Sequence, residues 1–110
     1  MTSNSASGRS ERGARIAAAD IPRAVTAAEL TYDDGSTQVF SSDGRTVYVE
    51  QGRRTNGEWY VDDDGRFCSF WPPSYRACYE LHWIIESGEF VGIAFHDVDH
   101  GSESVGRYRP

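Results

Sequence analysis

The sequence predicts an all-β domain, an antiparallel meander that forms a small barrel or a curled sheet. Glycine-centred turn signals recur along it: Asp33-Asp34-Gly35, Ser42-Asp43-Gly44, Asp62-Asp63-Asp64-Gly65, Ser87-Gly88 and His100-Gly101. The strands predicted between and beside these signals are short, roughly five to ten residues each. They alternate in polarity and are rich in aromatic and β-branched residues. Such spacing is typical of a sheet that folds back on itself, hairpin after hairpin.

The composition fits one small domain with large apolar side chains. The chain has 110 residues, with three Trp, six Tyr and five Phe to organise a core. Its formal net charge is −6, and its 11 Lys and Arg residues are all arginines. Because an acidic chain repels phosphate backbones, we expect no nucleic-acid partner.

No segment approaches the roughly 20 apolar residues that a membrane helix needs, so no membrane partner is expected. The first 15 residues are rich in Ser, Gly and Arg and lack the apolar stretch of a signal peptide. As written, the sequence predicts a cytoplasmic protein; removal of a signal peptide would make it periplasmic or secreted. We expect residues 1–15 to form a disordered tail and residues 16–110 to form a single β-barrel-like domain.

The Ala-rich segment 16–29 precedes the strands. Asp20 as N-cap with Pro22 in the first turn predicts a short helix there, and a lead-in strand is the alternative. From Leu30 onward the alternating pattern dominates. It predicts strands near 28–33, 36–41, 45–51, 57–62, 66–71, 77–86, 89–97 and 103–108.

Two hairpins allow the register to be predicted. A two-residue turn at Ser87-Gly88 would place Ile85 opposite Phe90, Trp83 opposite Gly92 and Tyr79 opposite His96, with Trp83, Tyr79 and His96 facing inward. A loop symmetric about Pro73 would place Cys68 opposite Cys78. Such a pair either forms a disulfide or packs as two thiols in a reducing cytosol.

The aromatic side chains of the inner face indicate a binding module for a small apolar or aromatic molecule, without an organic cofactor. We expect the ligand to contact Trp59, Trp71, Tyr79, Trp83 and His96. Core filling is the alternative for these residues. A second hypothesis is a small enzyme that uses His96 and Tyr79 for proton transfer. A third is a homodimer formed through an outer stripe of Ile84, Val91, Ile93 and Phe95.

The segment His96-Asp97-Val98-Asp99-His100 contains metal-ligand side chains. Alternation along a strand points His96 and Asp97 to different faces, so no metal site is expected. The sequence also lacks the Gly-rich phosphate loop, G-x-S-x-G and H-E-x-x-H motifs. Hydrolase and nucleotide chemistry of those kinds are therefore not expected.

Several short motifs carry a family resemblance. They are Gly57-Glu58-Trp59, the strand Arg66–Trp71 followed by Pro72, and Cys78-Tyr79. Over roughly residues 20–97 the chain resembles an uncharacterised family of small exported bacterial β-domains with a G-x-W strand, a cysteine strand ending in W-P, and a C-Y strand. The resemblance implies export and transfers no catalytic residue. The G-x-W strand is also similar, more weakly, to lipocalin and avidin barrels.

Overall fold

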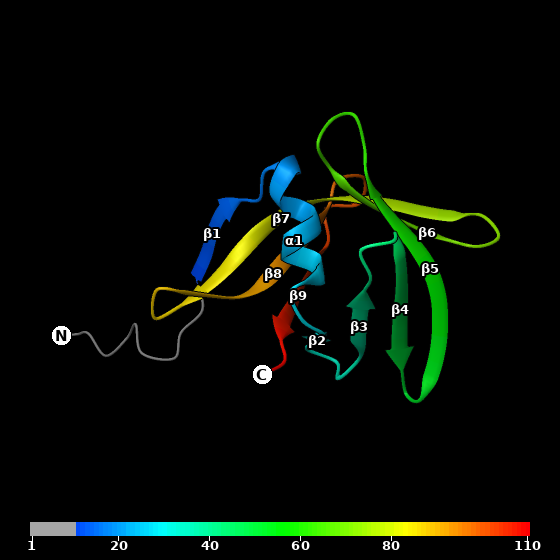
Figure 1. Cartoon of the computed structure of the whole chain (residues 1–110), viewed down its shortest axis with the longest axis horizontal. Helices are drawn as coiled ribbons and strands as arrows, with labels where there is room; N and C mark the ends of the chain where they lie inside the picture. The colour runs from blue at the N-terminus through cyan, green and yellow to red at the C-terminus, as the bar shows by residue number, and fades with distance from the viewer. Residues whose placement is uncertain (1–10) are drawn as a thin grey trace.

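Within residues 11–110, which the computed structural model describes, eight antiparallel strands close into a barrel and a ninth lies beside it (Figure 1). The predicted fold class is confirmed. In chain order the elements are β1 (Glu11–Arg15), the 3-10 helix η2 (Ala18–Asp20), α1 (Ile21–Thr26), β2 (Leu30–Tyr32), β3 (Thr37–Phe40), β4 (Arg45–Glu50), β5 (Arg53–Val61), β6 (Phe67–Trp71), β7 (Tyr75–Glu86), β8 (Glu89–Asp97) and β9 (Glu103–Tyr108).

The barrel is a simple meander. Each strand from β2 to β8 pairs with the next along the chain, and β9 pairs back onto β2. All eight predicted strands are present, with ends that differ by a few residues. Closure pairs nearly every strand edge within the barrel, which leaves little backbone free for aggregation.

Strand β1 corrects the predicted tail. Residues 11–15 are not disordered; they pair with residues 82–85 of β7. The reason is the length of β7: β6 covers only residues 75–79 of that edge, and β1 supplies hydrogen bonds to the remainder. Residues 1–10 of the predicted tail lie outside the described residues.

The predicted helix is confirmed, and the alternative of a lead-in strand is wrong. Asp20 occupies the N-cap of α1, and Pro22 lies in its first turn, where a missing N–H costs nothing. The Asp20 side chain makes no capping bond; it accepts a hydrogen bond of 2.9 Å from Arg23 Nη2. No helix in the described part of the chain is long and apolar enough to cross a membrane.

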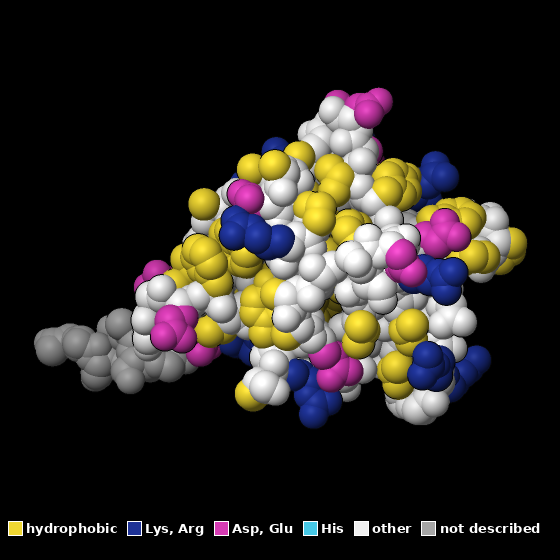
Figure 2. All heavy atoms as spheres, in the orientation of Figure 1, with side chains coloured by type: hydrophobic (Ala, Val, Ile, Leu, Met, Phe, Trp, Pro, Cys, Tyr) yellow, Lys and Arg dark blue, Asp and Glu magenta, His cyan; other side chains and the backbone are white. Residues whose placement is uncertain are grey.

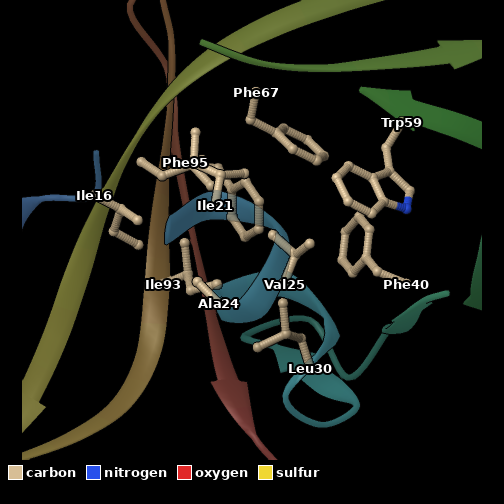
Figure 3. Close-up of a cluster of buried hydrophobic side chains, with 11 residues drawn as sticks. Ile16, Ile21, Ala24, Val25, Leu30, Phe40, Trp59, Phe67, Ile93 and Phe95 are labelled. Carbon is tan, nitrogen blue, oxygen red and sulfur yellow. The ribbon is translucent and has the colours of Figure 1, made fainter. Parts of the chain in front are cut away.

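Helix α1 closes one end of the barrel with its apolar face. Figure 3 shows Ile21, Ala24 and Val25 of α1 directed toward the side chains of the strands. The buried cluster comprises Ile16, Ile21, Ala24, Val25, Leu30, Phe40, Trp59, Phe67, Leu81, Ile93 and Phe95. This buried cluster fills only part of the barrel interior, since none of its residues from α1 lines the cavity described below.

A β-bulge changes the predicted register of β7 and β8. Ile85 pairs with Phe90 as predicted, but Ile84 pairs with Gly92, so one extra residue lies on β8. Every later pair is displaced by one residue, and Tyr79 faces Asp97 instead of His96. A shift of one residue turns all following side chains to the other face.

The arginines are spread over the visible surface. In Figure 2 acidic side chains gather at the β5–β6 turn at the top, and dark blue arginines lie at the β4–β5 turn at lower right. On this face of the described chain the basic side chains form no continuous patch. The absence of a nucleic-acid partner stays a prediction.

Candidate ligand-binding cavity

The end of the barrel away from α1 contains a cavity of about 580 Å³. Its lining runs from buried residues in the barrel to exposed residues at the β2–β3 turn and at the start of β9. The lining residues are Tyr32, Asp33, Asp34, Ser36, Gln38, Tyr48, Thr55, Phe67, Ser69, Trp71, Tyr79, Phe95, Glu103, Ser104 and Val105.

Six aromatic rings form most of the apolar lining. Phe67 and Phe95 belong to both the core cluster and the cavity, so they form its floor. Tyr79 lies against both of them, with centroid distances of 6.0 Å to each ring. On the other side Tyr48 lies 6.3 Å from Tyr32 and 6.3 Å from Trp71. Ring contacts at these distances hold the walls in fixed orientations.

One hydrogen-bond chain crosses the inner face of β2, β3 and β4. The Tyr32 hydroxyl donates to Gln38 Oε1 at 2.6 Å, and Gln38 Nε2 donates to Thr46 Oγ1 at 2.9 Å. Thr46 Oγ1 then donates to the Val39 carbonyl at 2.8 Å. Burial raises the pKa of Tyr32, with smaller contributions from neighbouring tyrosines and Asp34, so this phenol stays neutral.

A second chain leads to the β2–β3 turn. The Tyr48 hydroxyl donates to Ser36 Oγ at 3.1 Å, and Ser36 Oγ donates to Asp34 Oδ1 at 2.6 Å. The Ser36 backbone N–H also donates to Asp34 Oδ1. The two hydrogen bonds from Ser36 lower the pKa of Asp34, and the bond from the hydroxyl has the larger effect. Asp34 therefore remains a carboxylate at the rim of the cavity.

Trp71 covers a glycine of the neighbouring strand. A Cβ built on Gly57 would lie 2.5 Å from Cε3 of Trp71 and 2.9 Å from the Phe70 carbonyl oxygen. The indole therefore occupies the space that a side chain at residue 57 would fill. Its Nε1–H donates to Ser69 Oγ at 3.2 Å, which fixes the orientation of the ring. The glycine of the G-x-W motif thus has a specific structural role.

We predict that Gly57→Ala moves the Trp71 ring and lowers the free energy of unfolding by about 1–2 kcal/mol, because the added methyl overlaps the indole. The Trp71 contribution to the fluorescence emission should shift with it. Urea unfolding and the emission spectrum measure the two effects. Gly57→Ala with unchanged emission and stability would show that the indole does not rest on this glycine.

Two of the five predicted ligand contacts line the cavity: Trp71 and Tyr79. Trp59 is only 8% exposed and lies in the core, where it stacks on Phe67 and donates its Nε1–H to the Ser41 carbonyl. Trp83 packs at the edge of the core near the tip of the β7–β8 hairpin, stacked on Phe90 at 4.3 Å. For these two indoles the alternative of core packing holds.

The predicted inward orientation of His96 is wrong. Its side chain is 36% exposed, and its Nδ1 lies 3.6 Å from the Glu103 carboxylate. The bulge in β8 is the physical cause, because it turns Phe95 and Asp97 inward and His96 outward. His96 and Tyr79 therefore do not share an interior, and the structure does not assemble the proposed proton-transfer pair. Burial also raises the pKa of Tyr79, as do Tyr75 and Asp97.

The same one-residue shift of the β8 register contradicts the predicted apolar stripe on the outer face of the sheet. Ile93 and Phe95 lie in the barrel core and are at most 5% exposed, so they are not available to a second copy of the chain. Gly92 likewise faces Ile84, and Trp83 does not cover it. Homodimerisation stays a prediction without the surface that suggested it.

The cysteine register is confirmed. Cys68 pairs with Cys78 across β6 and β7, and the two sulfurs form a disulfide. Asp62 also lies nearby, with ligand atoms of all three residues within 4.8 Å. The two sulfurs are bonded to each other, so neither is a thiolate ligand.

In the segment from His96 to His100, the Asp97 carboxylate accepts hydrogen bonds from the backbone N–H groups of Asp99 and His100. It also contacts the ring of His100.

Sequence reasoning missed most of the cavity wall. Tyr32, Gln38 and Tyr48 carry its hydrogen-bond chains, and Phe95 forms part of its floor. Alternation along the third strand, where Gln38 and Phe40 are buried and Val39 is exposed, was the available signal for Gln38. The tyrosines lie near strand ends, and only closure of the barrel brings them opposite Trp71 and Tyr79.

The chain matches no protein-family model, and it matches neither a characterised protein nor a solved structure. The fold and cavity define a closed antiparallel barrel with aromatic clusters. The resemblance to small exported β-domains stays a prediction.

Proposed function

We propose that this protein binds one small molecule with an apolar or aromatic body inside its barrel. The observation that carries the proposal is the aromatic-lined cavity of about 580 Å³ at the end away from α1. Ligand sites in proteins typically occupy about 300–1,000 Å³ and combine apolar walls with a few fixed polar groups. The rings of Tyr48, Trp71 and Tyr79 with the hydroxyls of Ser36 and Ser69 match that description.

The strand number supports the same reading. An eight-stranded barrel has an interior that is either filled by side chains or wide enough for one small ligand. Here the core cluster with α1 fills one end, and the cavity occupies the other. The walls are held by ring contacts and hydrogen bonds, so a ligand would meet a site that is already formed.

We propose further that the protein works in an oxidising compartment, such as the periplasm or the extracellular space. The Cys68–Cys78 disulfide supports this location, because structural disulfides persist where thiols are not continuously reduced. The resemblance to exported β-domains points the same way.

A binding titration tests the function. We expect some members of a panel of neutral, cationic and anionic small aromatic molecules to shift the tryptophan emission and to give saturable heats by calorimetry. Trp71→Phe should remove most of the fluorescence change, because Trp71 is the only indole among the described residues that line the cavity. Trp83→Phe is the matched control, since Trp83 stacks on Phe90 away from the cavity.

Two results would count against the proposal. The first is the absence of any saturable heat across the panel. The second is a fluorescence change that survives Trp71→Phe and disappears in Trp83→Phe, because this would move the binding site to the hairpin tip. Thermal unfolding of each variant would verify that the barrel is intact.

A further inference from the structure

We propose that the ligand carries a positively charged amino or quaternary ammonium group. This inference rests on the proposed binding function and specifies its ligand class. Three independent features of the cavity support it: the electron-rich faces of its rings, the direction of its hydrogen bonds, and the sign of its charges.

The first feature is the set of rings. Tyr32, Tyr48, Trp71 and Tyr79 come from four different strands and surround one space. Trp71 meets the Tyr48 ring edge to face at an interplanar angle of 70°, so the walls are not stacked parallel. Indole and phenol rings attract cations through their negative faces, most strongly where water is excluded.

The second feature is the direction of the hydrogen-bond chains. One ends on the Val39 carbonyl and the other on the Asp34 carboxylate, and both of these groups can only accept. Because each chain of hydrogen bonds ends on a group that can only accept, the hydroxyls of Tyr32 and Tyr48 must donate their hydrogens to protein acceptors. The Trp71 N–H is likewise used by Ser69. The phenol oxygens of Tyr32 and Tyr48 therefore offer a ligand lone pairs, which suit a donor or a cation.

The third feature is charge. Asp33 and Asp34 bring two carboxylates to the rim, whereas no described lining residue is an arginine or a histidine. The carboxylate of Glu103 does not count toward this charge, since it pairs with Arg12 and lies near His96 on the outer surface. The formal net charge of −6 adds a long-range field of the same sign. An anionic ligand would meet repulsion from these carboxylates and would find no arginine or histidine among the described lining residues.

A matched pair of probes tests the inference. Phenyltrimethylammonium and tert-butylbenzene have nearly the same shape and differ in one charge. We expect the cation to bind at least tenfold more tightly, followed by Trp71 emission and by calorimetry, and to lose affinity as salt is raised. Benzoate should bind more weakly than either probe.

Variants locate the charge effect. Asp33→Asn should reduce the affinity for the cation severalfold and leave that for tert-butylbenzene unchanged. Asp63→Asn is the matched control, because Asp63 lies in the β5–β6 turn and does not line the cavity. An equal loss in both variants would assign the effect to overall charge and contradict the rim site.

The outcomes separate this inference from the proposed function. If tert-butylbenzene or benzoate binds as tightly as phenyltrimethylammonium, the inference is overturned and the binding function stands. If no probe of any charge binds, both are overturned. Tighter binding of the cation that depends on Asp33 and on Trp71 would establish both.

Discussion

Gly92→Ala is expected to lower the free energy of unfolding by about 3 kcal/mol or more. A Cβ at this position would overlap the Gly106 carbonyl oxygen and would lie 3.0 Å from Cα of Arg107. Both neighbours are backbone atoms of the adjacent strand β9, so no side-chain rotation can relieve the overlap. Strands β8 and β9 would therefore have to separate locally, although β9 also pairs with β2.

Urea unfolding followed by circular dichroism measures the effect as a lower midpoint. Gly13→Ala is the matched control. Its Cβ would meet Cδ1 of Ile85 at 2.6 Å, the far end of a flexible side chain that can rotate away. We expect a loss below about 1 kcal/mol there. Equal losses at Gly92 and Gly13 would contradict the explanation by backbone contact.

The sequence predicted the meander well because its turns are marked locally. The loop about Pro73 places Cys68 opposite Cys78, as predicted, and the Asp63-Asp64-Gly65 loop places Val61 opposite Phe67. In both hairpins the loop chemistry alone fixes the register. The strand order follows from chain order, since each strand pairs with the next.

The bulge between β7 and β8 could not be predicted in this way. No local signal marks the extra residue near Val91, because the hairpin begins with the predicted pair of Ile85 and Phe90. What favours the bulge lies elsewhere in the chain: it buries Ile93 and Phe95 and brings Gly92 against the backbone of Gly106. The contact of β8 with β9, which follows it in the sequence, therefore decides on which face of the sheet His96 lies.

The site was predicted only in the part that belongs to one hairpin. Trp71 and Tyr79 were found because β6 and β7 are adjacent in the chain. Tyr32 and Tyr48 complete the ring of aromatics only when β9 joins β2 and closes the barrel. Strand β1 was missed for a related reason, since its polar sequence forms a strand only on the free edge of β7.

Removal of the disulfide by Cys68→Ala with Cys78→Ala is expected to cost about 3 kcal/mol of stability. The two cysteines are 10 residues apart in sequence, and in the chain-entropy model a loop of that length restricts the unfolded state by this amount. Cys68 is fully buried, so its replacement adds a small packing loss. The midpoint of urea unfolding should fall accordingly.

A reducing agent provides the control. Dithiothreitol should move the midpoint of the wild-type protein to near that of the double variant and leave the variant unchanged, with two thiols titratable in the reduced wild type. Cys68 lies on β6 between Phe67 and Ser69, and alternation places its side chain on the face away from the cavity. Ligand affinity should therefore persist in the double variant under conditions where it remains folded. A loss of binding in the folded variant would show instead that the bridge also holds the cavity wall formed by β6 and β7.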